Sequence, residues 1–292
     1  MSYTRIFSLT LLAMIAFAGN SLLCRVALKH TAIDAASFTT IRLISGAIIL
    51  WLVVGIRSGT QSGRGSWVSS FALFAYAAGF SFAYLSLPAA TGALLLFGAV
   101  QATMIGYGLW TGERLLKIQF VGLMFAFAGI VGLLLPGISA PPLTGSVLML
   151  GAGMAWGIYS IRGKGAGDPT RVTAGNFLRS VPVALALSAL TFNHRSLDIA
   201  GFCYAVVSGA LASGIGYAIW YTVLPALKST SASTVQLSVP VIAALGGVAI
   251  LGEPITLRLA LASIAILGGI ALVILEKSSA NSIQQIIPAD RH

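Results

Sequence analysis

The chain of 292 residues is 57% hydrophobic and only 8% charged, whereas a soluble domain carries roughly 25% charged residues. Its 17 Lys and Arg against 7 Asp and Glu give a net charge of +10, but most of the basic residues lie in the gaps between apolar runs. That placement is typical of a membrane topology signal, so no nucleic-acid partner is expected. The two cysteines, Cys24 and Cys203, have neither metal-binding nor redox spacing.

Ten segments are apolar enough and long enough to cross a bilayer, which takes about 20 residues in a helix. The gaps between them are too short to hold a soluble domain. The chain is therefore predicted to be an all-α integral membrane protein with ten transmembrane helices and a polar C-terminal tail at 278–292. The predicted spans are 5–24, 34–56, 67–87, 91–111, 115–135, 144–162, 170–190, 199–222, 229–251 and 256–276.

The first of these segments also resembles a secretory signal peptide, because Arg5 and an apolar run precede Ala16-Phe17-Ala18. The segment has a counterpart later in the chain, however, in which Trp156 corresponds to Phe17 and Lys164 to Arg25. Cleavage would leave that counterpart unmatched, so we expect the segment to be kept as the first span.

A long stretch of the sequence occurs twice. Thr91–Leu135 is matched by Ser231–Leu275, and in both copies an apolar run, a short hinge and a second apolar run follow one another. The hinge Gly112-Glu113 of the first copy aligns with Gly252-Glu253 of the second. A duplicated pair of membrane-spanning helices is the simplest interpretation.

The other predicted spans pair in the same way, and Arg42 falls opposite Arg179. Each copy then holds five spans. Because five is an odd number, the second copy must enter the membrane from the side opposite to the first. We expect two inverted five-helix repeats, at 1–137 and 138–277, an arrangement that many secondary transporters use for alternating access.

The Lys and Arg residues of the gaps also predict the orientation. Most of them fall on the side of the membrane where the N-terminus lies. Basic residues are enriched in cytoplasmic loops, and an even number of spans returns the chain to the side on which it began. Both termini are therefore expected in the cytoplasm.

Ten spans in two repeats, with Gly252-Glu253-Pro254 between the last two, resemble the EamA group of the drug/metabolite transporter superfamily. Within it, the chain is most similar to the YddG-type exporters of aromatic and other neutral amino acids. The resemblance covers nearly the whole chain and implies export across the bacterial inner membrane, through a cavity between the repeats. A broad-specificity metabolite or drug exporter of the same superfamily is the alternative. The first hinge, Gly112-Glu113-Arg114, departs from the pattern because it lacks the proline.

The candidate substrate contacts are aromatic and polar residues within the predicted spans. Aromatic walls suit a flat apolar side chain, and their faces attract an ammonium group. Buried amides would be costly against lipid, so they face the bundle, where they contact substrate or tie helices together. For Tyr84 and Tyr221, near span ends, the interfacial aromatic belt is an equal alternative. The predicted set is Phe17, Asn20, Tyr76, Phe80, Tyr84, Gln101, Trp156, Tyr159, Tyr217, Trp220, Tyr221, Gln236 and Ser238.

Two arginines and two prolines inside predicted spans complete the candidates. Arg42 and Arg179 either reach the nearer interface along their helices or act in gating or carboxylate recognition. Pro182 and Pro240 are candidate bend points, since proline frees a backbone carbonyl in a helix.

The acidic residues all fall at the ends of predicted spans, in gaps or in the tail. No catalytic constellation, metal cluster or intramembrane proton relay is therefore expected, and neither is a cofactor. We predict a transporter rather than an enzyme, working by facilitated export of an amino acid or related metabolite. The oligomeric state is left open, a monomer included.

Overall fold

A computed structural model gives the fold and describes residues 2–56, 63–112, 114–163, 167–227 and 235–286. Within these ranges the regular elements are helices. Nine are long and apolar enough to cross a membrane, and one further apolar helix is shorter. The bounds are α1 Tyr3–His30, α2 Ala35–Ile56, α3 Trp67–Tyr84, α4 Ala89–Trp110, α5 Lys117–Leu134, α6 Leu143–Gly163, α7 Pro169–Leu190, α8 Ile199–Val207, α9 Gly216–Val223, α11 Ser238–Leu251 and α12 Leu257–Ile286.

The prediction of an all-helical membrane protein is confirmed, and α8 and α9 form one span joined by a π-helical segment, Ser208–Ile215. The ninth predicted span, 229–251, is shorter than expected in the described part of the chain, where α11 begins at Ser238. Most of the difference, up to residue 234, lies outside the described residues.

Two helices continue by more than one turn beyond their predicted ends. The first ends at His30 rather than at residue 24, because Arg25 is accommodated inside the bundle and Lys29 and His30 suit the negative end of the helix. The last continues to Ile286, and no glycine or proline lies between residues 277 and 286 to break it.

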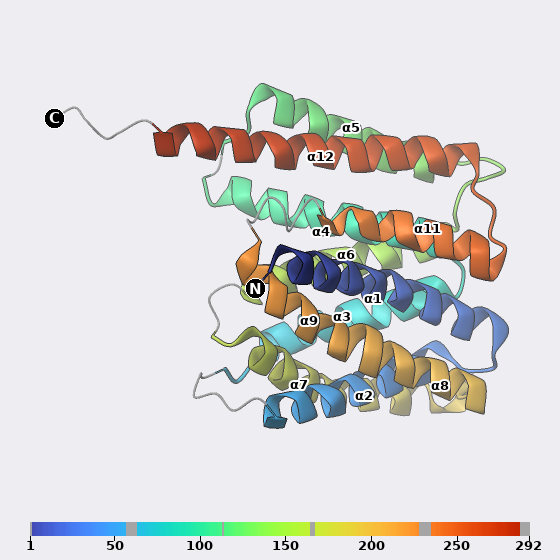
Figure 1. The fold of residues 1–292 in the computed structure, drawn as a ribbon. Coiled ribbons are helices and arrows are strands. Elements are labelled where there is room, and N and C mark those ends of the chain that lie inside the picture. Colours follow the sequence, from blue (N-terminus) through green and yellow to red (C-terminus); the bar gives the residue numbers. More distant parts are fainter. Residues whose placement is uncertain (1, 57–62, 113, 164–166, 228–234, 287–292) are drawn as a thin grey trace.

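The helices lie side by side with their axes roughly along one direction (Figure 1). The pair α5 and α12 forms one side of the bundle, while α2, α7 and α8 lie on the other. Between these sides, α6 packs against both α3 and α4, and α1 contacts α9 and α11. The start of α1 and the end of α12 lie at the same end of the bundle (Figure 1).

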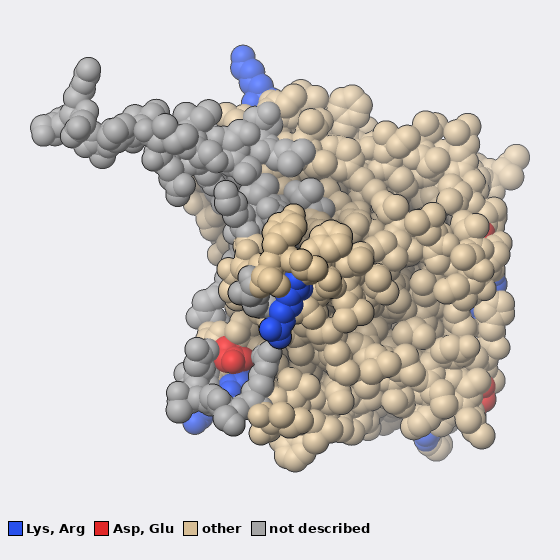
Figure 2. Space-filling model, in the orientation of Figure 1, with Lys and Arg blue, Asp and Glu red and all other residues tan. Residues whose placement is uncertain are grey.

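The flank of the bundle is apolar. Charged side chains lie towards the two ends, and the middle of the face in view is free of them (Figure 2). Large apolar side chains on α5 and α12 are widely exposed, among them Phe125, Phe127, Leu261 and Ile264. Such a surface would favour aggregation in water but suits contact with lipid, as expected of a multi-pass membrane protein.

Small residues let pairs of helices approach closely. A Cβ atom added at Gly269 of α12 would lie 2.3 Å from the carbonyl oxygen of Gly122 of α5. Gly129 of α5 is similarly confined, because a Cβ there would meet Ile266 at 2.8 Å. The α5–α12 contact therefore depends on backbones that touch directly, as is usual where two helices meet in a membrane.

The two predicted bend points differ in their surroundings. Pro182 lies inside α7, which stays one helix, and its ring is exposed on the flank. Pro240 is the third residue of α11, where a missing N–H removes no hydrogen bond from within that helix. A hinge role for either residue stays a prediction.

Candidate functional site

A small cavity lies inside the bundle, lined by residues from both halves of the chain. Its volume is about 30 Å³, enough for one or two water molecules and far below the roughly 300–1,000 Å³ of small-molecule sites. The bundle is thus nearly closed at its centre. The lining residues are Phe17, Asn20, Ser21, Tyr76, Phe80, Leu96, Phe97, Trp156, Ala212, Tyr217 and Gln236.

The predicted substrate contacts divide into two groups. Seven of them line this cavity: Phe17, Asn20, Tyr76, Phe80, Trp156, Tyr217 and Gln236. The other six lie outside the lining, and three of these pack directly behind it. Tyr84 meets the Phe80 ring edge-on at 4.7 Å, Tyr159 stacks on Trp156 at 5.2 Å, and Trp220 contacts Phe17 at 6.1 Å.

The remaining three predicted contacts have other surroundings. Gln101 is buried in α4, and Tyr221 is half-buried in α9. The Ser238 hydroxyl donates a 2.6 Å hydrogen bond to the carbonyl of Val235, which is a local helix-end contact. A role for these residues in substrate binding stays a prediction.

The aromatic walls of the cavity form a connected group around Trp156. Its ring lies 4.8 Å from Tyr76 and stacks on Tyr217 at 5.2 Å and 28°. Phe17 then meets Tyr217 edge-on at 5.6 Å. Rings from α1, α3, α6 and α9 therefore hold one another at separations that favour aromatic pairing, and they present apolar faces to the cavity.

A polar network crosses behind these rings and joins α1, α2 and α3 to the π-helical segment. Arg42 donates from Nη2 to the Tyr76 hydroxyl at 2.9 Å and from Nε to the Ser213 hydroxyl at 3.3 Å. Asn20 donates to the same Tyr76 hydroxyl at 3.3 Å and accepts a 2.6 Å bond from Ser208. The cavity therefore has a hydrogen-bonded side as well as an apolar one.

The π-helical segment explains why Ser208 and Ser213 both belong to this polar network. In an α-helix with 3.6 residues per turn, side chains five positions apart point in clearly different directions. The wider π-helical turn, with its i→i+5 bonds, brings such a pair much closer to one face. Ser208 then contacts Asn20 while Ser213 contacts Arg42. This pairing could not be read from the sequence, because nothing in Ser208–Ile215 marks a π-helix.

The two predicted arginines have different environments. Arg42 does not reach an interface: it is 1% exposed, and its Cζ lies 4.9 Å from the centre of the Phe80 ring and 5.2 Å from that of Tyr76. Arg179 instead bonds the carbonyls of Gly175, at 2.9 Å, and Arg64. Arg179 thus bonds main-chain carbonyls within α7 and before α3, while Arg42 lies behind the rings that line the cavity. A role in gating or carboxylate recognition stays a prediction for both.

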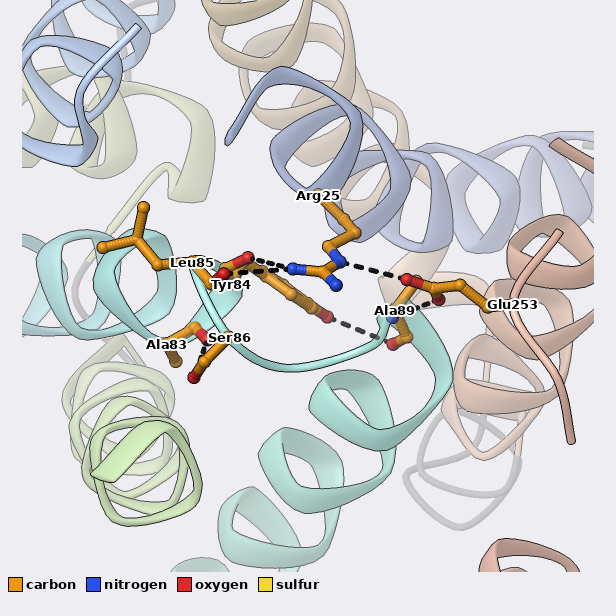
Figure 3. Close-up of polar contacts among 7 residues, drawn as sticks. All are labelled: Arg25, Ala83, Tyr84, Leu85, Ser86, Ala89 and Glu253. Carbon is orange, nitrogen blue, oxygen red and sulfur yellow. Dashed lines mark hydrogen bonds and ion pairs between the residues drawn. The ribbon is translucent and has the colours of Figure 1, made fainter. Parts of the chain in front are cut away.

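An ion pair that the sequence did not predict joins the two halves of the chain. Arg25 Nε donates to Glu253 Oε1 at 3.0 Å, and the two residues are 9% and 7% exposed (Figure 3). Arg25 follows the end of the first predicted span and Glu253 belongs to a predicted hinge, yet both side chains are buried. Their repeat counterparts, Lys164 and Glu113, lie outside the described residues.

The pair also satisfies two helix ends at the turn between α3 and α4. Arg25 Nη1 donates to the carbonyls of Tyr84 at 2.9 Å and Leu85 at 3.2 Å, where α3 ends. Glu253 Oε2 accepts from the backbone N–H of Ala89 at 2.7 Å, where α4 begins. Each charge faces the helix end of opposite polarity, so one contact fastens α1, the α3–α4 turn and the α11–α12 hinge together.

The hinge glycine positions Glu253. Gly252 has φ +62°, a left-handed conformation that ends α11. Glycine adopts this conformation without the strain that a side chain would bring. The chain turns there, and Glu253 follows with its N–H bonded to the carbonyl of Gly247 at 3.1 Å. The Gly-Glu sequence is therefore a helix cap followed by a buried acid.

A second, larger cavity lies at the end of the bundle beyond the Arg25–Glu253 pair. Its volume is about 340 Å³, and its lining includes Arg25, Lys29, Thr91, Glu253 and Thr256. Ser21, at the inner cavity, and Arg25 are one helical turn apart on α1, a rise of roughly 6 Å. The ion pair accordingly lies between the inner cavity and this end vestibule.

Comparisons with known proteins agree with this architecture. The sequence model of the EamA-like transporter family matches residues 143–275. An uncharacterized protein of Pseudomonas aeruginosa, PA1977, is 55% identical over 271 residues, which cover 92% of this chain and 94% of that protein. The threonine/homoserine exporter RhtA of Escherichia coli is 31% identical over 147 residues, 48% of each chain.

Two further similarities extend over most of the chain. An uncharacterized transporter of Archaeoglobus fulgidus is 26% identical over 253 residues, covering 80% of this chain and 85% of its own. A solved crystal structure shares the fold with a TM-score of 0.65 and 19% sequence identity, over 94% of this chain and 99% of its own. The fold is thus shared over nearly the whole chain, and residues 143–275 belong to the EamA-like transporter family, a family of transporters rather than enzymes.

Proposed function

We propose that the chain exports aromatic and other neutral amino acids across the bacterial inner membrane by alternating access. The observation that carries this proposal is the inner cavity, because residues of both halves line it and its walls are aromatic rings with amides among them. Rings stack on flat apolar side chains, and amides offer hydrogen bonds to the polar end of an amino acid.

The relatives support the chemical class. RhtA of Escherichia coli, which is 31% identical over 48% of this chain, is a threonine/homoserine exporter. In this chain the cavity is lined by Phe17, Tyr76, Phe80, Trp156 and Tyr217 instead of by charged groups. We infer that its substrates carry larger apolar side chains than threonine does.

Alternating access requires a path that closes at one end while it opens at the other. The buried Arg25–Glu253 pair is proposed as the closed gate of this conformation, since it lies between the inner cavity and the end vestibule. With both termini in the cytoplasm, this gate and vestibule face the outside. Export then requires the pair to separate and the α3–α4 turn to move away from Glu253.

The proposal is tested by counterflow into proteoliposomes that contain the purified protein, with each of the twenty amino acids in turn. Phenylalanine, tyrosine and tryptophan are expected to exchange faster than aspartate, glutamate or lysine. Equal background rates for all twenty, from a protein that unfolds cooperatively on heating, would refute amino-acid transport.

A broad-specificity metabolite or drug exporter is the second candidate, and the same ring-lined cavity favours it because ring faces also attract cations. Competition separates the two functions. Under the amino-acid proposal, a bulky aromatic cation leaves phenylalanine counterflow unchanged, whereas under the alternative it inhibits counterflow and is itself transported.

We further propose that transport is facilitative. Within the described residues no acidic side chain lines the inner cavity, and Glu253 is engaged by Arg25 and Ala89. Efflux from loaded proteoliposomes should therefore proceed without an imposed proton gradient. Strict dependence of efflux on such a gradient would contradict this part of the proposal.

A further inference from the structure

Arg42 is the most deeply buried charged residue in the described part of the chain, with 1% of its surface exposed. Its Nε and Nη2 atoms donate to the Ser213 and Tyr76 hydroxyls, but Nη1 has no hydrogen-bond partner. No described carboxylate lies within ion-pair distance of it. The guanidinium therefore keeps a full positive charge and an unused donor inside the bundle.

A buried cation without an anion is costly, by several kcal/mol before compensation. The faces of Phe80 and Tyr76 compensate in part, at 4.9 and 5.2 Å from Cζ. Two neutral hydroxyls add two hydrogen bonds. None of these partners is an anion, so the site remains short of one negative charge.

The unpaired positive charge of Arg42 lies next to the proposed transport path. Tyr76 and Phe80, the two rings packed against it, are themselves walls of the inner cavity. Arg42 is not part of the lining and lies directly behind these rings. The cavity holds only one or two waters as it stands, so admitting a solute requires its walls to move. Displacement of Tyr76 would expose the guanidinium to the cavity.

We propose that Arg42 is the anion-recognising group of this transporter and that its substrates must carry a carboxylate, whereas their amino group is dispensable. This inference rests on the proposed function and names the part of the substrate that is recognised. The planar guanidinium offers two parallel N–H groups, Nη1 among them, which fit the two oxygens of a carboxylate.

The lack of a matching acid supports the second half of the proposal. Among the described residues, the lining of the inner cavity contains amides and aromatic rings but no Asp or Glu to pair with an ammonium. Ring faces and amide oxygens accept an ammonium only weakly by comparison with a carboxylate. An aromatic carboxylic acid without an amine should therefore bind about as well as the amino acid.

The test uses four ligands of one shape with the full-length protein in detergent and in proteoliposomes. Phenylalanine carries both groups, 3-phenylpropionate only the carboxylate, and phenethylamine and phenylalaninamide only the amine. Binding is measured by the change in tryptophan fluorescence, and transport by competition with phenylalanine counterflow. We expect the two carboxylates to bind about tenfold to hundredfold more tightly than the other two, the factor that a charge-assisted hydrogen bond supplies.

Variants of Arg42 assign that preference to the guanidinium. Arg42→Lys keeps the charge but loses the planar fork, and it should weaken 3-phenylpropionate binding about tenfold or more. Arg42→Gln should abolish the preference for carboxylates over phenethylamine. Arg195→Gln, which removes an exposed charge between α7 and α8, is the control and should leave the preference unchanged. If Arg42→Gln does not fold, the lysine variant and the ligand series with the wild-type protein still test whether Arg42 recognises the carboxylate.

The outcomes separate this inference from the proposed function. Binding of phenethylamine or phenylalaninamide as tight as that of 3-phenylpropionate would overturn the role of Arg42, even if phenylalanine is transported. Absence of phenylalanine counterflow, together with Arg42-dependent binding of 3-phenylpropionate, would overturn amino-acid export and leave the carboxylate site standing.

Discussion

Arg25 and Glu253, 228 positions apart in the chain, form a buried ion pair with 3.0 Å between Nε and Oε1. The pair also completes the ends of α3 and α4, because Arg25 bonds the last carbonyls of one helix and Glu253 the first N–H of the other. The pair therefore stabilises the fold through its bonds to the two helix ends as well as through the attraction between opposite charges. Substitutions can measure both contributions.

Removing either partner should destabilise the protein strongly. Arg25→Met or Glu253→Gln alone leaves a buried charge without its counterion, which costs about 3–5 kcal/mol. The double variant should lose less stability than the sum of the two single losses. The difference, which is the coupling energy, should be about 0.5–3 kcal/mol, the range seen for directly interacting residues. Thermal unfolding in detergent provides the values.

Lys29→Met is the control for this cycle. Lys29 lies one turn further along α1 and is exposed, so its loss should change stability by no more than about 0.5 kcal/mol. If the double variant is destabilised by the sum of the two single losses, the attraction between Arg25 and Glu253 contributes nothing to the stability of the folded state.

Exchanging the two charges should fail to restore stability. The double substitution Arg25→Glu with Glu253→Arg keeps the attraction between opposite charges, but places an anion at the carbonyl end of α3 and a cation at the N–H end of α4. Both placements oppose the helix dipoles. We expect the exchanged protein to unfold at a lower temperature than wild type, and recovery of the wild-type value would show that helix ends are irrelevant here.

Asp34 should make stability sensitive to acid. Burial would raise the pKa of this carboxyl, but hydrogen bonds from the side chain and backbone of Ser37, and from the backbones of Ser196 and Ala36, outweigh it and lower the pKa. The carboxylate thus stabilises the fold above its ordinary pKa of about 3.9. That contribution is lost as the pH falls below this value and through the lowered pKa.

The measurement compares wild type with Asp34→Asn between pH 6 and pH 3. Asp34 accepts from the N–H of Ser37 at 2.9 Å and from that of Ser196 at 3.1 Å, so it joins the start of α2 to the loop after α7. Wild type should be the more stable at pH 6, and the difference in unfolding temperature should shrink towards pH 3. A difference that stays constant with pH would contradict a lowered pKa.

Trp156→Phe should weaken the binding of aromatic substrates. Trp156 stacks on both Tyr217 and Tyr159 at 5.2 Å, and a smaller ring keeps only part of those contacts. A pair of rings contributes about 0.5–1.5 kcal/mol, and the pair that matters for binding is Trp156 with the ring of the substrate. Phenylalanine affinity, measured by counterflow, should therefore fall by about twofold to tenfold. Trp67→Phe is the control, because Trp67 is exposed at the start of α3. An equal effect of both substitutions would argue against Trp156 as a substrate contact.

Neighbouring glycines of α12 should respond in opposite ways to alanine. At Gly269 a Cβ atom would lie 2.3 Å from the Gly122 oxygen, so Gly269→Ala must push α5 away and should cost about 1–3 kcal/mol. At Gly268 nothing lies within 4 Å of the added atom. Gly268→Ala should therefore be neutral or stabilise the helix by up to about 1 kcal/mol. Similar melting temperatures for the two variants would contradict the close α5–α12 contact.

Much of the fold was predictable because membrane-spanning helices are encoded locally. A bilayer requires long apolar segments, and these are visible in the sequence without knowledge of tertiary contacts. The exceptions follow from packing: α1 runs on to His30 because Arg25 has partners inside the bundle. The first apolar run ends just before Arg25, whereas the helix continues past it.

The site was predictable only in part. Aromatic residues at mid-span, such as Trp156 and Tyr217, proved to line the cavity because apolar rings without lipid exposure have few other places to lie. The sequence repeat equates Arg42 with Arg179, but only Arg42 has a tyrosine and a π-helical serine beside it. Such partners come from other helices, so equivalent positions in a repeat acquire different environments.

The narrowness of the inner cavity bears on how any measured affinity should be understood. A protein that spends most of its time in this nearly filled conformation must rearrange before a solute fits. The apparent Kd then equals the intrinsic Kd divided by the fraction of molecules in the receptive state. If one molecule in a hundred is receptive, affinity appears a hundredfold weaker. Substitutions away from the lining that change this fraction will therefore change the apparent Kd, although they alter no direct contact with the solute.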